Sequence, residues 1–159
     1  MFRPLLLGLA LAAPLAAQAQ MDLSLGDAAT DTGAPVEVTA DSLSVDQATG
    51  TATFTGNVLV VQGDIRLSAG AVEVVYDAEG GAIARLLASG GVTFATPTEA
   101  AEAASADYDL ATGLLTLTGE VLLTQGNAAI AAERMVVNLA DGSAQLDGRV
   151  RTTFLPDTQ

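Results

Sequence analysis

The sequence predicts an all-β fold built from about four copies of one hairpin unit. Apolar and polar side chains alternate over several segments, one motif recurs along the chain, and turn-forming residues separate the copies. Alternation with a period of two is typical of strands that bury one face. We therefore expect about twelve to sixteen short antiparallel strands, arranged as a jelly roll or as stacked hairpins.

The first segment, 1–19, has the features of an export signal. Arg3 precedes an apolar run over 5–15, and Ala17-Gln18-Ala19 is a small-x-small cleavage pattern. The run is too short for a spanning helix, which needs about 20 apolar residues, and Pro14 interrupts it. We predict cleavage near Ala19 and export of the mature chain.

The remaining boundaries follow from composition. Segment 20–35 is rich in Asp, Ala, Thr and Gly and has no sustained period, so we expect a disordered leader. Segment 36–155 holds the repeats and forms the single folded domain, and 156–159 is expected to be a frayed tail.

The repeat is clearest when 48–58 is compared with 111–121, which lies 63 residues later. The same offset relates Gln62-Gly63-Asp64 to Gln125-Gly126-Asn127. Shorter copies complete the series, so that the second glycine of the motif stands at Gly56, Gly90, Gly119 and Gly148. A glycine that recurs within a strand predicts a bulge or bend where the sheet curls.

Alternation assigns a face to each strand residue. Threonines such as Thr53 and Thr116 take the outer face, and apolar residues take the inner face. The inward positions predicted in this way are Phe54, Val58, Val60, Ile65, Leu67, Val72, Val74, Val92, Phe94, Leu115, Leu117, Val121, Leu123, Ile130, Met135, Val137 and Leu146.

Turn signals separate the strands, and one segment departs from the strand pattern. The turns are expected at 46–50, 62–64, 79–81, 125–127 and 141–142. Segment 97–106 is rich in Ala and Glu, which suit a helix, and we expect a long loop or a single helical turn there.

Composition excludes several classes of function. The chain has 159 residues and a formal net charge of −13, and its six cations are all arginines. Nucleic-acid binding is excluded because it needs clustered Lys and Arg. The absence of Cys and His removes disulfides, thiol chemistry and imidazole catalysis.

Asp107 and Asp109 are the strongest candidates for paired catalytic carboxylates. General acid–base work would need a partner across a cleft in a contrasting environment, and the sequence marks none. We interpret both as solvated surface acids. We predict no catalytic residue, no metal site and no cofactor, so an enzyme is the least favoured class.

The apolar inner face allows two interpretations. It can be an ordinary core, or it can line a slot that accepts hydrocarbon, because Val, Leu, Ile, Ala and Met dominate it. Composition alone favours the core and does not decide the question. The corresponding functions are a lipid carrier and an exported β-repeat module that assembles through its strand edges without lipid.

The order of the motifs resembles the OstA-like domain of the lipopolysaccharide-transport family. The resemblance covers about 36–155 and rests on 38–43 (VTADSL), 52–63 (ATFTGNVLVVQG), 68–76 (SAGAVEVVY), 86–94 (LLASGGVTF), 106–110 (ADYDL) and 114–121 (LLTLTGEV). It implies an open, twisted antiparallel β-jelly roll in the periplasm, whose inward residues bind the acyl chains of lipid A.

The resemblance also implies partners. Members of this family stack head to tail with copies of themselves and with homologous jelly-roll domains of inner-membrane and outer-membrane partners, and they move lipopolysaccharide without converting it. Lipopolysaccharide is anionic, whereas the chain keeps only five arginines once the signal is removed. We therefore expect the protein to hold the acyl tails and to leave the phosphates in solvent.

Overall fold

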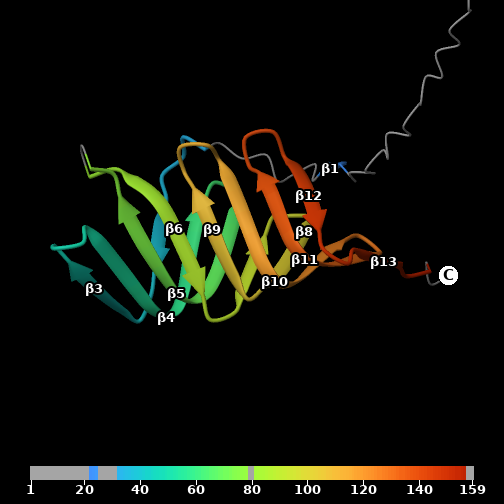
Figure 1. Ribbon diagram of the computed structural model, residues 1–159, viewed down its shortest axis with the longest axis horizontal. Helices are drawn as coiled ribbons and strands as arrows, with labels where there is room; N and C mark the ends of the chain where they lie inside the picture. Colours follow the sequence, from blue (N-terminus) through green and yellow to red (C-terminus); the bar gives the residue numbers. More distant parts are fainter. Residues whose placement is uncertain (1–21, 25–31, 79–80, 157–159) are drawn as a thin grey trace, which may run out of the picture.

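The chain forms one continuous antiparallel sheet that folds back on itself as a roll (Figure 1). The structure, a computed structural model, describes residues 22–24, 32–78 and 81–156. In that part of the chain every regular element is a strand, and there are thirteen of them. The predicted all-β antiparallel fold is confirmed.

The strands differ in length, and four of them are much longer than the others. The long strands are β4 (Thr51–Gln62), β5 (Ile65–Tyr76), β10 (Leu114–Gln125) and β11 (Ala128–Asn138). The short strands are β1 (Asp22–Ser24), β2 (Glu37–Thr39), β3 (Ser42–Asp46), β6 (Ile83–Ser89), β7 (Val92–Ala95), β8 (Glu99–Ala103), β9 (Ser105–Asp109), β12 (Ser143–Asp147) and β13 (Arg151–Phe154).

The long strands run through both layers of the roll, and the short strands belong to one layer each. We call the layer that contains β3, β6, β9, β12 and β1 the β6/β9 layer. The other, with β2, β7, β8 and β13, is the β7/β8 layer. The two layers meet at a bend in every long strand, which we call the corner. The opposite side, where the strands of both layers end, is the seam.

The recurring glycines build the corner. Gly56 and Asn57 both have positive φ, 84° and 47°, and the β4–β5 register shifts between Thr55 and Val58. Two residues of β4 therefore face one residue of β5, which defines a bulge. The same pair of positive φ angles recurs at 90–91, 119–120 and 148–149. The bend predicted at the motif's second glycine is confirmed in all four copies.

The strand opposite each bulge changes face at the corner. In β5 the inward residues step from Ala69 to Val72, and in β11 they step from Ala132 to Met135. In a straight strand, side chains three residues apart point to opposite faces of the sheet. Because the strand bends at the corner, two apolar side chains three residues apart both point inward, one on each side of the bend.

Segment 97–106 corrects the expectation of a loop or single turn. It contains β8 and the start of β9, and β8 lies between β7 and β10 with both neighbours paired to it. Ala101 and Ala103 are buried. Helix propensity is a weak preference, and here the hydrogen bonds offered by two flanking strands outweigh it.

The N-terminal predictions fall partly outside the described residues. The signal at 1–19 lies wholly outside them, and so do 157–159 of the predicted tail. Within the predicted leader, 22–24 pair as β1 with β12 through Asp22↔Gln145 and Ser24↔Ser143. Among the described residues, no helix has the length and apolar character of a membrane span.

Candidate functional site

The interior between the two layers is the candidate site. Of the seventeen side chains predicted to point inward, the structure buries sixteen, and Phe54 is partly buried against the same cluster. Phe54 pairs with Leu43 of β3 at one end of the roll, where fewer neighbours cover it. The structure thus brings the predicted set together, and its contact with lipid stays a prediction.

Sequence reasoning missed part of this interior. Leu86, Tyr108 and Leu139 are buried there and were not predicted. Tyr108 carried a usable signal, because alternation places it on the face opposite Asp107 and Asp109. Buried alanines complete the set: Ala52, Ala69, Ala88, Ala101, Ala103, Ala106, Ala132 and Ala144.

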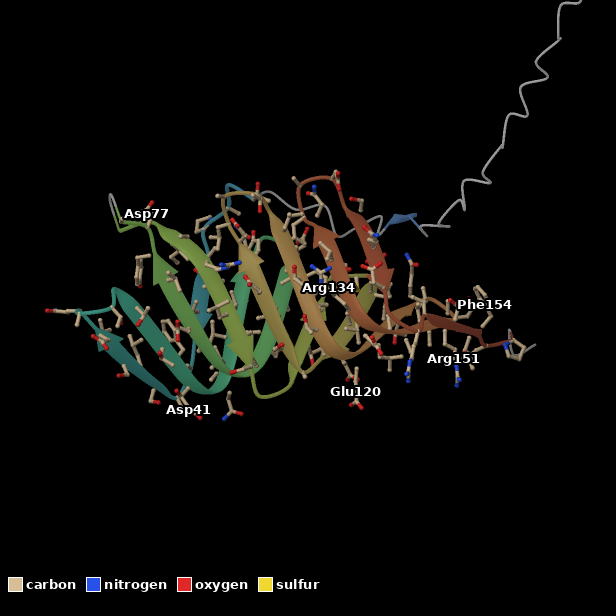
Figure 2. The ribbon with its side chains drawn as sticks, in the orientation of Figure 1. Asp41, Asp77, Glu120, Arg134, Arg151 and Phe154 are labelled. Atoms are coloured by element: carbon tan, nitrogen blue, oxygen red, sulfur yellow. The ribbon has the colours of Figure 1, made fainter. Side chains whose placement is uncertain are left out.

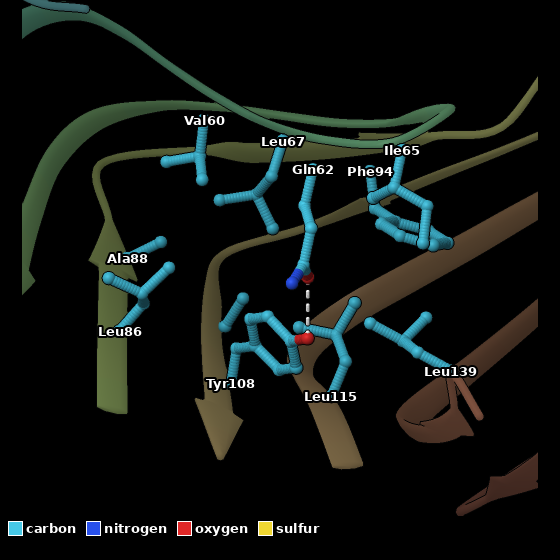
Figure 3. A pocket seen from close by; sticks show the side chains of 11 residues that line it. Val60, Gln62, Ile65, Leu67, Leu86, Ala88, Phe94, Tyr108, Leu115 and Leu139 are labelled. Atoms are coloured by element: carbon cyan, nitrogen blue, oxygen red, sulfur yellow. Dashed lines mark hydrogen bonds between the residues drawn. The ribbon is translucent and has the colours of Figure 1, made fainter. Parts of the chain in front are cut away.

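In the part of the chain that the structure describes, apolar side chains of both layers pack closely in the interior. A cavity of about 20 Å³ remains between Leu67, Phe94, Leu115 and Leu139 (Figure 3). A cavity of that size has room for about one water molecule. An acyl chain can therefore occupy this space only after the two layers move apart.

Two polar side chains meet within this apolar interior, beside the seam. Gln62 ends β4 in the β7/β8 layer, and Tyr108 belongs to β9 in the β6/β9 layer. The Tyr108 hydroxyl donates to Gln62 Oε1 over 2.7 Å, and both side chains are buried (Figure 3). The ordinary pKa of a tyrosine is already far above neutral, and burial raises the pKa of Tyr108 further. The phenol is therefore a donor at neutral pH.

Glu99 is a buried carboxylate in the same layer as Gln62. Its Oε2 accepts from the Thr96 hydroxyl, and its Oε1 accepts from Gln125 Nε2 over 3.2 Å. Burial alone would raise the pKa of Glu99, but hydrogen bonds from Thr96, Thr98 and Gln125 together outweigh burial and lower it. A carboxylate that stays ionised and hydrogen-bonded ties β8 to β10 and is a poor general acid.

Asp107 and Asp109, the two carboxylates considered as a catalytic pair, are engaged elsewhere. Asp107 Oδ1 lies 2.7 Å from Arg85 Nε, with both side chains partly exposed. Asp109 Oδ1 accepts from the backbone N–H groups of Ala111 and Thr112 in the turn that follows β9. One acid thus forms a surface ion pair and the other stabilises a turn, which agrees with their interpretation as surface acids.

The two ends of the roll expose apolar side chains and unpaired strand edges. Within the described residues, β1, β2, β3 and β13 each pair on one side only. Leu43 and Val45 of β3 are 54% and 62% exposed at one end, and Phe154 of β13 is 71% exposed at the other. Figure 2 shows Phe154 and Arg151 at that second end. Both ends can therefore accept a further strand.

The ends also differ in charge. Glu37 and Asp46 lie on the edge strands of the first end. At the second end Arg151 lies on β13, and Arg149 Nε lies 3.8 Å from Glu133 Oε1 in an exposed ion pair. Acids on the edge strands of one end and Arg151 on the edge strand of the other are compatible with a head-to-tail contact, in which the second end of one copy meets the first end of another.

Comparison with known proteins places this geometry in a family. The family model described as LptA/(LptD N-terminal domain) LPS transport protein matches residues 37–143. The lipopolysaccharide export system protein LptA of Escherichia coli K12 is 30% identical over 139 residues, which cover 79% of this chain and 74% of that protein. An uncharacterized protein of Rhizobium meliloti is 31% identical over 136 residues, which cover 79% and 73% of the two chains.

A solved structure shares the fold. The crystal structure of LptH, the LptA homologous periplasmic component of the lipopolysaccharide transport device from Pseudomonas aeruginosa, matches with a TM-score of 0.70. The match covers 80% of this chain and 99% of LptH, at 19% sequence identity. It supports the predicted jelly-roll architecture.

Proposed function

The chain belongs to the family of LptA and the LptD N-terminal domain, which are lipopolysaccharide transport proteins, and we propose that it carries the acyl chains of lipid A between its two layers. As a member of this family it is a non-catalytic component of lipopolysaccharide transport in the periplasm. The observation that carries the proposal is the continuous apolar face on the inner side of both layers.

Burial of the acyl chain offsets the cost of opening the packed interior. Burying an acyl chain of about ten methylenes supplies roughly 8 kcal/mol. Parting the layers breaks apolar contacts, but the acyl chain replaces them with contacts of the same kind. The eight buried alanines project little from the sheet, so a chain lying over them displaces few atoms.

The head group is expected to remain outside. The chain has a formal net charge of −13, and a lipid phosphate brought against it would be repelled. We propose that the saccharide and phosphates face solvent while the protein holds only the tails.

Mass spectrometry of the native protein purified from cell envelopes tests the cargo. We expect a bound lipid with the acyl composition of lipid A, or its uptake when purified protein is incubated with lipopolysaccharide. The packed interior favours a second candidate, a structural module that assembles through its edges without lipid. Protein that contains no acylated ligand and takes none up would support that module and contradict the carrier.

We propose further that copies stack head to tail through their free edges, and that homologous jelly-roll domains of inner-membrane and outer-membrane partners dock in the same way. A heterologous contact of this kind does not close, so it extends the groove from one copy to the next. The exposed apolar residues and the strand edges that pair on one side only support this arrangement.

The stack predicts a change in solution mass for an edge variant. Leu43→Lys/Val45→Lys replaces two exposed apolar side chains of the edge strand β3 by cations, which disfavour the addition of a further strand at that edge. We expect sedimentation velocity to show concentration-dependent association of the native protein and a monomer for the variant. Leu114→Lys is the matched control, because Leu114 is 38% exposed on β10, away from both ends. Equal association of the two variants would contradict edge stacking.

Export is the remaining proposal. We propose that the segment 1–19 is removed after Ala19 to release the mature chain, as its pattern predicts. N-terminal sequencing of the protein from cells is expected to begin at Gln20. A chain that begins at Met1 would indicate a retained anchor instead.

A further inference from the structure

A polar contact between Gln62 and Tyr108 joins the two layers through the apolar interior. Gln62 reaches from the end of β4 toward Tyr108 of β9, and Figure 3 shows their side chains meeting among Leu67, Leu115 and Leu139. Both residues lie beside the seam, on the side of the roll away from the corner. The contact therefore holds the layers together where no continuous strand does so.

The same glutamine holds a segment that crosses the seam. Gln62 Nε2 donates to the backbone carbonyls of Thr32 and Ala34, each over 3.1 Å. Residues 32–36, which we call the strap, lead into β2 of the β7/β8 layer (Figure 1, blue). The Thr32 methyl group lies 3.7 Å from the position that a Cβ on Gly113 would take, in the turn between β9 and β10. The strap thus touches both layers.

The second half of the repeat shows that the fold does not require this arrangement. Gln125 occupies the position of Gln62, 63 residues later, at the end of β10. Its Nε2 bonds Glu99 of β8, which belongs to the same layer. Two glutamines at equivalent positions therefore differ, because one joins the layers and the other reinforces a single layer.

We propose that Gln62, Tyr108 and the strap form a releasable closure of the seam, and that an acyl chain enters the interior between β4 and β9 when this closure opens. The inference rests on the proposed function. The interior cavity of about 20 Å³ requires the layers to part before any chain can bind. The corner is continuous backbone in β4, β5, β10 and β11, so the seam is the side that can separate.

Hydrogen bonds suit a closure that must open repeatedly. In the closed state they satisfy polar groups that would otherwise be buried without partners. When the seam opens, water replaces the lost partners, so the net strength of each bond is small. A purely apolar seam would offer no such exchange with water.

Two conservative variants test the closure. Gln62→Met keeps the side-chain length and removes its hydrogen bonds, and Tyr108→Phe removes only the hydroxyl. Gln125→Met and Tyr76→Phe are the matched controls, because Gln125 lies within one layer and Tyr76 is 38% exposed. The full-length mature proteins are mixed with cis-parinaric acid, a fatty acid that fluoresces in apolar surroundings, and uptake is followed by stopped-flow fluorescence.

We expect uptake at least about fivefold faster in Gln62→Met and Tyr108→Phe than in the native protein, the effect of losing one hydrogen bond of typical net strength. The two controls are expected to match the native rate. Equal rates in all five proteins would overturn the closure and leave the carrier proposal standing. No uptake in any of them would overturn the carrier proposal and the closure together.

Amide hydrogen exchange gives a second readout that needs no lipid. Loss of the closure is expected to speed exchange in the strap and β9 by about fivefold, and to leave the corner residues of β10 unchanged. Circular dichroism first shows that each variant is folded. Unchanged exchange in the strap of both folded variants would overturn the closure, whatever the fatty acid does.

Discussion

Leu117→Asp is expected to unfold the protein at 25 °C. Leu117 is fully buried in β10, between Ala106 of β9 and Met135 of β11. The substitution removes about 2–3 kcal/mol of apolar burial and adds the cost of a buried, unpaired carboxylate, which is several kcal/mol more. The sum is comparable to the whole stability of a small domain, roughly 5–15 kcal/mol.

Thr118→Asp provides the control for this change. Thr118 is the next residue of the same strand, is exposed on the outer face, and pairs with Arg134 of β11. A carboxylate there stays in water beside a cation, so we expect a change within about 0.5 kcal/mol. Urea unfolding followed by circular dichroism measures both. A folded Leu117→Asp protein with near-native stability would contradict the assignment of Leu117 to the interior.

Gly119→Ala is expected to give the second large effect, at the corner. Gly119 has φ = +87°, and an added Cβ would lie 2.7 Å from the Cβ of Ala104. The left-handed backbone costs about 1–2 kcal/mol for a residue with a side chain, and the steric clash costs about 1–3 kcal/mol more. Because the bulge also aligns the two halves of β10, relaxing the clash would disturb the register with β11.

Gly126→Ala separates the two causes. Gly126 has φ = +56°, but an added Cβ would meet no atom within 4 Å. This variant is expected to lose only the conformational part, about 1–2 kcal/mol. Denaturant unfolding of both variants gives the comparison. Equal losses would show that the close approach to Ala104 does not restrain the corner.

The fold could be predicted because its determinants are local and repeated. Alternation predicted seventeen inward residues, and sixteen of them are in the buried cluster. The motif's second glycine predicted a bend at four positions, and the backbone has positive φ angles at all four. Segment 97–106 could not be predicted in this way. Its composition favours a helix, and its strand structure depends on hydrogen bonds to β7 and β10, which are non-local.

The candidate site was harder to predict than the fold. Alternation along a strand shows which side chains point inward. Whether the two layers leave a gap depends on how their side chains pack against one another across the interior, which alternation does not show. The contact between Gln62 and Tyr108 joins residues 46 positions apart, and no short-range pattern carries that information. Alanine was expected on the inner face as a residue type, but most of the individual alanines were not assigned to it, because a small side chain gives a weak hydrophobic signal on either face.

Photo-crosslinking at two neighbouring leucines of β10 tests the central claim most directly. Leu123 is 1% exposed on the inner face, and Leu122 is 39% exposed on the outer face. A photoreactive amino acid is placed at one position or the other in living cells, and adducts are detected with an antibody to lipopolysaccharide. We expect adducts from position 123 and none from position 122. Adducts from both positions alike, or from position 122 alone, would contradict transport through the interior of the roll.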